Sequence, residues 1–372
     1  MSDQEDNYDD NYPEAEQEIE AEMGQEEEET KPEETGEEEQ QKEGEEEEKP
    51  EEHVEEEERP PDVSLNEEIM SESLLLLAKT GNGLSHAYVR LDAAQKGLTD
   101  ISLLKNYIHL RYIDLSNNNL KDISALNCLT HLLTLKLDFN RLTSAKLDPL
   151  PYLQIASFSN NRIKTTEGIC HPKLEILNLN KNEITEIKGF EADKLPNIQT
   201  LELRENKLTT TKGIRLPSLK SIFIAANMLT SLDDLRDLKN LNALHLRDNK
   251  IENLDGFTEN MESLQYINLR GNVLTSFSEI KKLHILPKLR ALVLLDNPLT
   301  ENSDYRLEVL ISVRRLERLD KDEYQEEERT EAEEIHEQRR IKEQEAALES
   351  ASNVNEDQNQ DNEDNDKNEN DE

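Results

Sequence analysis

Histidine, cysteine and acidic side chains are the groups in this sequence that could carry covalent or metal chemistry. The chain of 372 residues has eight histidines and two cysteines, and none of them stands at metal-ligand spacing from another. It has no phosphate-binding glycine loop, zinc-protease helix or nucleophile-elbow motif. The acidic runs lack the spaced oxygen ligands and the glycine of a calcium loop. We therefore predict no catalytic residue, metal site, cofactor or small-molecule substrate, and expect that the protein is not an enzyme. Surface or packing roles are expected for His109, His131 and His171.

An asparagine that recurs every 21 to 25 residues is the most regularly spaced polar side chain. An amide has both a donor and an acceptor, so at a buried turn it can satisfy the backbone groups of a neighbouring repeat. Losing such an amide would cost about 1–3 kcal/mol. The predicted structural ladder consists of Asn118, Asn140, Asn161, Asn182, Asn206, Asn227, Asn249, Asn272 and Asn297.

Each of these asparagines stands in the phrase LxxLxLxxNxL, which recurs nine times from Leu110 onward. Leucines two residues apart predict a short strand with one apolar side. Because one such strand cannot bury its apolar side alone, the repeats are expected to stack as a parallel sheet with a continuous core. We predict an α/β repeat fold: a curved leucine-rich-repeat solenoid, with its strands on the concave face, over residues 84–296, including a degenerate first repeat.

The segments next to the solenoid are expected to cap it. Ser64 and Glu67 are typical of a capping box, and apolar residues at helical spacing follow them, which predicts a capping helix over residues 64–83. Residues 297–321 depart from the repeat and predict a C-terminal cap made of a short helix and a strand-like turn. Residues 322–350 are rich in helix formers but poor in apolar residues, which predicts a solvated helix.

Charge is concentrated outside the repeats. The formal net charge is −41, although residues 85–320 hold 32 Lys and Arg against 29 Asp and Glu. The acidic segments 1–63 and 351–372 have few apolar residues and are expected to be disordered tails. Because no basic patch is concentrated anywhere, we do not expect a nucleic-acid partner.

The compartment follows from what the chain lacks. No apolar segment follows Met1 and no apolar run is long enough to cross a bilayer, so we expect neither a signal peptide nor a membrane partner. Cys128 and Cys170 fall two repeats apart, too far for a disulfide. We expect an intracellular, cytoplasmic protein.

Outward-facing strand positions predict where a partner binds. They are mixed and polar in the N-terminal half, and aromatic, cationic or aliphatic from the sixth clear repeat onward, as in interface cores. The predicted partner-binding residues are Phe223, His245, Arg247, Tyr266, Asn268, Arg270, Val293 and Leu295. We expect Tyr266 to lie in solvent, and Arg247 and Arg270 to address one acidic loop of the partner. A ladder Asn→Ala change should therefore destabilise the fold more than Tyr266→Ala.

Several segments go beyond the generic repeat, among them LAKTGNGLSHAYVRL, LPYLQIASFSNNRI and LERLDKDEYQEEERTEAEEI. Over residues 64–335 the sequence resembles a family of intracellular leucine-rich-repeat proteins from the radial spokes of motile cilia and sperm flagella. The resemblance implies a structural, cytoskeletal subunit of the axoneme that binds radial-spoke head proteins and other axonemal proteins and is needed for beating. Two alternatives stay open: a regulatory subunit of a protein phosphatase, and an acidic histone-binding repeat protein.

Overall fold

The computed structural model describes residues 61–346 apart from 82 and 343, and the two predicted acidic tails lie almost entirely outside this range. The described chain forms two compact units. Unit 1 holds the residues up to Lys207 together with Gly213–Ile224. Unit 2 holds Leu208–Lys212 together with the residues from Ala225 onward.

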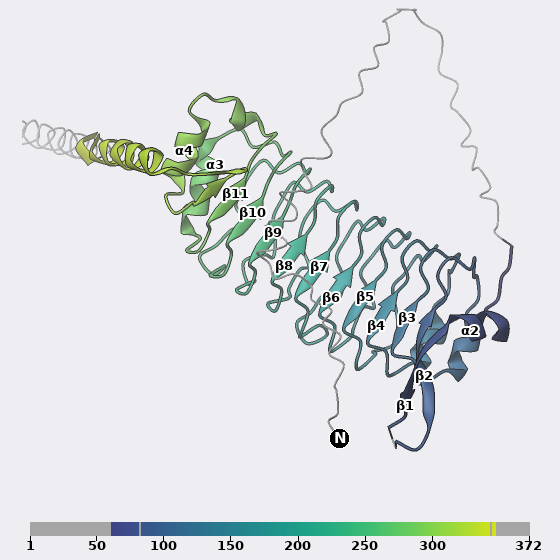
Figure 1. The fold of residues 1–372 in the computed structure, drawn as a ribbon. Coiled ribbons are helices and arrows are strands. Elements are labelled where there is room, and N and C mark those ends of the chain that lie inside the picture. The colour runs from purple at the N-terminus through teal and green to yellow at the C-terminus, as the bar shows by residue number, and fades with distance from the viewer. Residues whose placement is uncertain (1–60, 82, 343, 347–372) are drawn as a thin grey trace, which may run out of the picture. The chain divides into compact units, whose positions relative to one another are not determined.

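Unit 1 is a stack of coils, each of which adds one short strand to a sheet (Figure 1). The period-2 pattern operates as predicted: in β3 the middle residue, Ile113, is buried between two half-buried neighbours. Strands β2 to β8 pair in parallel, so equivalent leucines and isoleucines lie side by side in the core. The elements of unit 1 are α2 (Glu67–Ser73), β1 (Leu74–Lys79), β2 (His86–Asp92), the 3-10 helix η1 (Ser102–Asn106), β3 (Tyr112–Asp114), η2 (Ser124–Cys128), β4 (Thr134–Lys136), β5 (Ile155–Ser157), β6 (Ile176–Asn178), β7 (Thr200–Glu202) and β8 (Ser221–Phe223).

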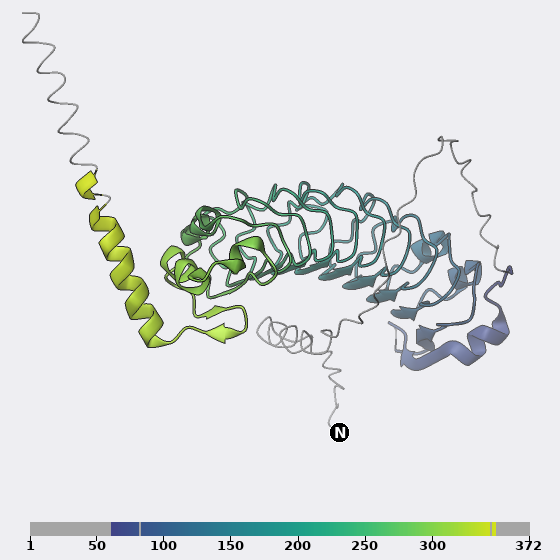
Figure 2. The ribbon, with the colours of Figure 1, turned by 90° about the horizontal axis from the view of Figure 1, so that it is seen from above.

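Unit 2 continues the same repeat and then changes at its C-terminal end. Strands β9 to β12 are parallel, and β13 turns back antiparallel to β12. A helix over residues 326–342 follows and extends away from the coils of this unit (Figure 2). The other elements of unit 2 are β9 (Ala243–His245), β10 (Tyr266–Asn268), α3 (Phe277–Lys281), η3 (Lys282–Ile285), β11 (Ala291–Val293), η4 (Pro298–Glu301), α4 (Tyr305–Ser312), β12 (Arg318–Leu319) and β13 (Asp322–Glu323). The predicted class, an α/β repeat of stacked parallel strands with helices near both ends, is confirmed.

All nine asparagines of the column are buried in the turns that follow the strands. In Asn118 the side-chain Nδ2 donates to the carbonyl of Ala93 in the preceding coil, at 3.0 Å, and to that of Leu115, at 2.8 Å. Its Oδ1 accepts from the backbone N–H of Leu98 at 2.9 Å. Asn272 makes the equivalent three contacts in unit 2. Each of these amides thus joins its own turn to the neighbouring coil.

The N-terminal capping helix is shorter than predicted. The helix α2 ends at Ser73, and the residues expected to continue it form β1, antiparallel to β2. Its N-cap is Asn66, whose side chain accepts from the N–H of Ile69 at 2.9 Å, whereas Ser64 forms a bridge with Asp100. Pairing with β2 satisfies a whole row of backbone groups, and this tertiary gain outweighs the helical preference of the leucines.

The segment that follows the last repeat contains α4 and β12, a helix and a strand where the C-terminal cap was expected. The solvated helix predicted over residues 322–350 begins later, because 322 and 323 are part of β13. Its first turns are anchored by Ala332, which is buried. Residues 347–350 lie outside the described part.

Candidate interaction surface

Strands β9, β10 and β11 direct alternate side chains outward on one side of unit 2, and we call this side the unit-2 strand face. Period-2 alternation sends the leucines of these strands into the core and the other side chains to this face. The face comprises the predicted residues His245, Tyr266, Asn268 and Val293 on the strands, and Arg247, Arg270 and Leu295 in the turns that follow.

The aromatic side chains of the unit-2 strand face are buried. The ring centroids of His245 and Tyr266 are 5.0 Å apart with an angle of 51° between the planes, and each residue is only 1% exposed. Neighbouring strands lie about 4.8 Å apart, so a ring on one strand packs on the ring of the next. The expectation that Tyr266 lies in solvent is therefore wrong. Tyr266→Ala should cost about 3–5 kcal/mol, more than the loss of a ladder asparagine.

The two arginines of this face have carboxylate partners in their own unit. Arg247 Nε lies 3.0 Å from Asp248 Oδ2, and Arg270 Nε lies 2.7 Å from Asp296 Oδ2. Both aspartates directly precede a ladder asparagine and have positive φ angles, which aspartate tolerates better than most residues. The expectation that both arginines address a single acidic loop of a partner stays a prediction, although each guanidinium lies beside a different carboxylate of its own unit. Arg247, Arg270 and Leu295 are half-buried, so part of each side chain remains accessible.

Phe223 belongs to unit 1, where Arg204 lies over its ring at 4.5 Å from the centroid. It is also buried. The outward positions of β3 to β7, the unit-1 strand face, are mixed, with polar side chains such as Asp114 and Lys136 beside Ile155 and Ile176. There Asp138 accepts hydrogen bonds from the Ser157 hydroxyl and from the Ser159 N–H, and burial raises the pKa of the Asp138 carboxyl.

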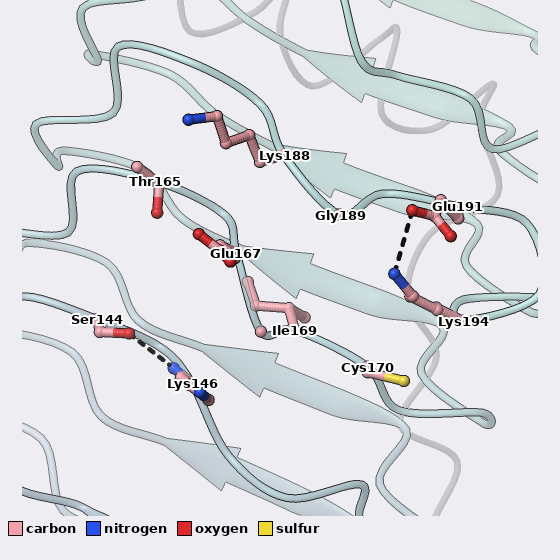
Figure 3. A pocket seen from close by; sticks show the side chains of 11 residues that line it. Ser144, Lys146, Thr165, Glu167, Ile169, Cys170, Lys188, Gly189, Glu191 and Lys194 are labelled. Carbon is pink, nitrogen blue, oxygen red and sulfur yellow. Dashed lines mark hydrogen bonds and ion pairs between the residues drawn. The ribbon is translucent and has the colours of Figure 1, made fainter.

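A hollow of about 780 Å³ on unit 1 was a second candidate for a site. Figure 3 shows lysines and glutamates alternating around it. Lys194 pairs with Glu191 at 3.1 Å, and Lys188 pairs with Glu186 just outside the lining. Because the charges pair with one another rather than converge on one point, this lining does not form a set of catalytic groups.

The chemistry-bearing residues are separate from one another in the part of the chain that the structure describes. Within that part, no group of three or more His, Cys, Asp and Glu side chains could hold a metal ion. Cys128 and Cys170 are free thiols. His171 packs in the core, where its Nδ1 accepts from the Leu150 N–H at 3.2 Å and burial lowers its pKa to about 4. Among the described residues, no helix has the length and apolar character needed to cross a bilayer.

The hairpin of β1 and β2 carries a group of residues that sequence reasoning missed. Leu75, Leu76 and Leu77 are exposed on β1, as are Leu84 in the turn and Tyr88 on β2. The available signal was the run of four consecutive leucines, which follows no helical period and so gives a helix no polar side.

Comparison with family models agrees with this architecture. Family models described as leucine-rich repeat match residues 210–349, 172–229 and 109–129. Among solved structures, the leucine-rich repeat domain of APL1B is 18% identical, with a TM-score of 0.48, and the match covers 62% of this chain and 67% of that chain.

Curated relatives match most of the chain. Leucine-rich repeat-containing protein 23 of Homo sapiens is 54% identical over 268 residues, which is 72% of this chain and 78% of the relative. The protein of the same name from Bos taurus is 53% identical over an equal length, and that from Xenopus tropicalis is 49% identical over 274 residues, or 73% of this chain and 78% of the relative. With identity at this level over more than two thirds of both chains, the chain belongs to the leucine-rich repeat-containing protein 23 family.

Proposed function

We propose that this chain is a non-enzymatic, protein-binding scaffold and a structural subunit of the radial spoke head in the axoneme, required for ciliary or flagellar motility. The observation that carries the proposal is the membership of the leucine-rich repeat-containing protein 23 family, taken together with the resemblance of residues 64–335 to radial-spoke proteins noted from the sequence. Its partners would be radial-spoke head proteins and other axonemal proteins.

The unit-2 strand face is the proposed docking surface. Its support is the mixture of side chains that interfaces favour: a packed aromatic pair at the centre, with arginines and an aliphatic residue around it. The buried His245 and Tyr266 would set the shape of the surface. The half-buried Arg247, Arg270 and Leu295 would touch the partner, and arginines at such positions often contribute on the order of 2 kcal/mol each.

The test compares two double variants of the full chain, expressed in ciliated cells that lack the native protein. Arg247→Ala with Leu295→Ala changes the unit-2 strand face, whereas Thr134→Ala with Lys136→Ala is the matched control on the unit-1 strand face. We expect the first pair to lower affinity for the axoneme by about thirtyfold or more and to reduce incorporation, while the control incorporates normally. Melting temperatures establish that both variants are folded.

Cross-linking mass spectrometry on isolated axonemes identifies the partner. Cross-links between unit 2 and spoke-head proteins would support the proposal. Normal incorporation of the folded Arg247→Ala, Leu295→Ala variant would place the docking surface elsewhere. Cross-links confined to a phosphatase catalytic subunit or to histones would instead favour one of the two alternative functions.

A further inference from the structure

The β1–β2 hairpin concentrates the exposed large apolar side chains of the described residues. Five of its large apolar side chains are exposed, of eleven in all the described residues: Leu75 45%, Leu76 54%, Leu77 56%, Leu84 86% and Tyr88 47%. The turn of the hairpin also extends beyond the neighbouring coil turns (Figure 1). Clustered apolar exposure of this kind is characteristic of interaction sites, whereas single exposed leucines are ordinary.

The backbone of β1 is open as well. This strand is the first of its sheet, and among the described residues it pairs with β2 alone. Leu76 has a φ of +55° and is missing from the register with β2, although Leu75 and Leu77 are paired with it. The left-handed residue turns the Leu76 side chain out of the sheet, so three consecutive leucines are exposed beside an open strand edge. An edge of this composition pairs readily with another strand.

The flanking segments of this chain do not have the composition to cover such an edge. Half of residues 1–60 are Asp or Glu, and residues 351–372 are rich in Asn, Asp and Glu. A strand that packs on leucines has to be apolar itself. A second copy of the chain supplies one in the form of its own β1.

Charge favours this second copy in one orientation. The helix α2, which leads into one end of the hairpin, carries Glu67, Glu68 and Glu72, whereas the opposite end of the hairpin has Lys79 and His86. Antiparallel self-pairing places the acidic end of one copy against the basic end of the other, and parallel pairing would place like charges together. The Glu72 carboxylate lies 3.5 Å from Lys96 Nζ, which is a long ion pair, and its side chain is exposed. It can therefore also reach a lysine of a second copy.

We propose that two copies of this chain associate through their β1 strands, paired antiparallel about a twofold axis between Leu75 and Leu76. In this register Leu74 lies opposite Leu77 of the second copy, and Lys79 lies beside the end of α2, where Glu72 is located. The contact is isologous, because each copy contributes the same β1 edge, so it closes at a dimer rather than growing into a fibre.

Sedimentation velocity of the full chain over a wide range of concentration tests the proposal. The wild-type chain should pass from monomer to dimer as its concentration rises. Leu75→Lys with Leu77→Lys should raise the dimer dissociation constant by more than about tenfold, because lysine side chains would be desolvated at the contact. The control, Ile108→Lys with Val273→Lys, makes the same chemical change at two exposed sites elsewhere and should dimerise like the wild type.

A charge swap tests the register without touching a leucine. Lys79→Glu alone should weaken the dimer, and Glu72→Lys combined with Lys79→Glu in the same chain should restore it. Melting temperatures near the wild-type value establish that each variant is folded. A wild-type chain that is monomeric at every concentration would overturn the proposal, as would a dimer unaffected by the β1 lysines. Protection of β1 from hydrogen exchange only in a complex with a different protein would assign the edge to a foreign strand and also overturn it.

Discussion

The two ends of the described chain close their units in opposite ways. At the C-terminal end of unit 2, the Asp320 carboxylate accepts from the backbone N–H groups of Leu294 and Leu295, at 2.8 and 3.1 Å, and from the Tyr305 hydroxyl at 2.9 Å. At the N-terminal end of unit 1, α2 buries Met70 but leaves the leucines of β1 exposed. One end satisfies its polar groups within the chain, and the other leaves an apolar edge.

The closure of unit 2 continues outward through Arg306. Its guanidinium pairs with Glu328, donates to the carbonyl of Glu323 at 2.7 Å and lies 4.2 Å from the ring centroid of Tyr324. The Tyr324 hydroxyl donates in turn to the carbonyl of Arg306 at 2.9 Å. Parallel strands need a cap because their last edge would otherwise template aggregation. Unit 2 has a cap of this kind, which ends in the short acidic strand β13, whereas β1 is a six-residue apolar edge.

Asp320→Ala should have the largest effect on this comparison. It removes one acceptor shared by three donors and places alanine at a φ of +56°, so it should lower the free energy of unfolding by about 3–5 kcal/mol. Asp320→Asn keeps an acceptor and tolerates that φ, so it should cost less. Urea unfolding measures the loss of stability in both variants, and hydrogen exchange in β11 and β12 shows whether the loss is local to the cap. An Asp320→Ala loss no larger than that of Leu75→Ala with Leu77→Ala would remove the contrast between the two ends.

Arg306→Ala should have the next largest effect, about 1–3 kcal/mol, because it unpairs Glu328 and uncovers the Tyr324 ring. Arg306→Lys keeps the charge but loses the planar fork, so it should recover only part of the loss. Urea midpoints of the two variants and the wild type give the order. Full recovery by lysine would mean that charge alone holds this cap.

Acid should loosen the C-terminal helix before the coils unfold. Arg339 lowers the pKa of Glu308, and Arg306 lowers that of Glu328, chiefly through side-chain hydrogen bonds. A carboxylate with a lowered pKa in the folded state stabilises that state above its ordinary pKa, about 4.3. This stability is lost as the pH falls from the ordinary pKa through the lowered pKa of the folded state. Hydrogen exchange of residues 326–342, corrected for the intrinsic rate, should therefore accelerate in this window.

Glu308→Gln is the control for the acid prediction. It removes the titrating group that holds Arg339, so the helix should be looser at neutral pH and should respond less to acid. An identical pH response in this variant would assign the loosening to other groups.

The repeat architecture could be predicted because every repeat contains the same sequence pattern. Leucines at period 2 and an asparagine at the turn give the strand, the core and the ladder from local sequence alone. The extent of α2 could not be predicted in this way. Residues 74–79 directly follow the helix α2, so the sequence predicts that the helix continues through them. They form a strand because they pair with β2 across the hairpin turn.

The burial of the candidate surface could not be predicted from the sequence. Alternation places His245 and Tyr266 on the outward side of their strands, and it says nothing about their exposure. Their burial arises between two residues 21 positions apart on neighbouring coils, where one ring packs on the other, and no single repeat contains that information. The same holds for Arg270 and Asp296, which pair across a separation of 26 residues. Side-chain partners in neighbouring coils depend on rotamers, which the repeat phrase does not specify.

Leu76→Gly should have the smallest effect and gives the finest test of the N-terminal end. A left-handed φ costs a leucine about 1–2 kcal/mol, and glycine avoids this cost while losing about 0.5–1 kcal/mol through backbone entropy. Leu76 is exposed, so little packing is lost, and the monomer should be stabilised slightly or left unchanged. Leu75→Gly, at a paired and extended position of the same strand, should lower stability by about 0.5–1 kcal/mol. Urea unfolding, at protein concentrations where the chain is monomeric, compares the stabilities of the Leu76→Gly and Leu75→Gly variants. Equal losses would mean that Leu76 is an ordinary strand residue, and the three adjacent exposed leucines would then need another cause.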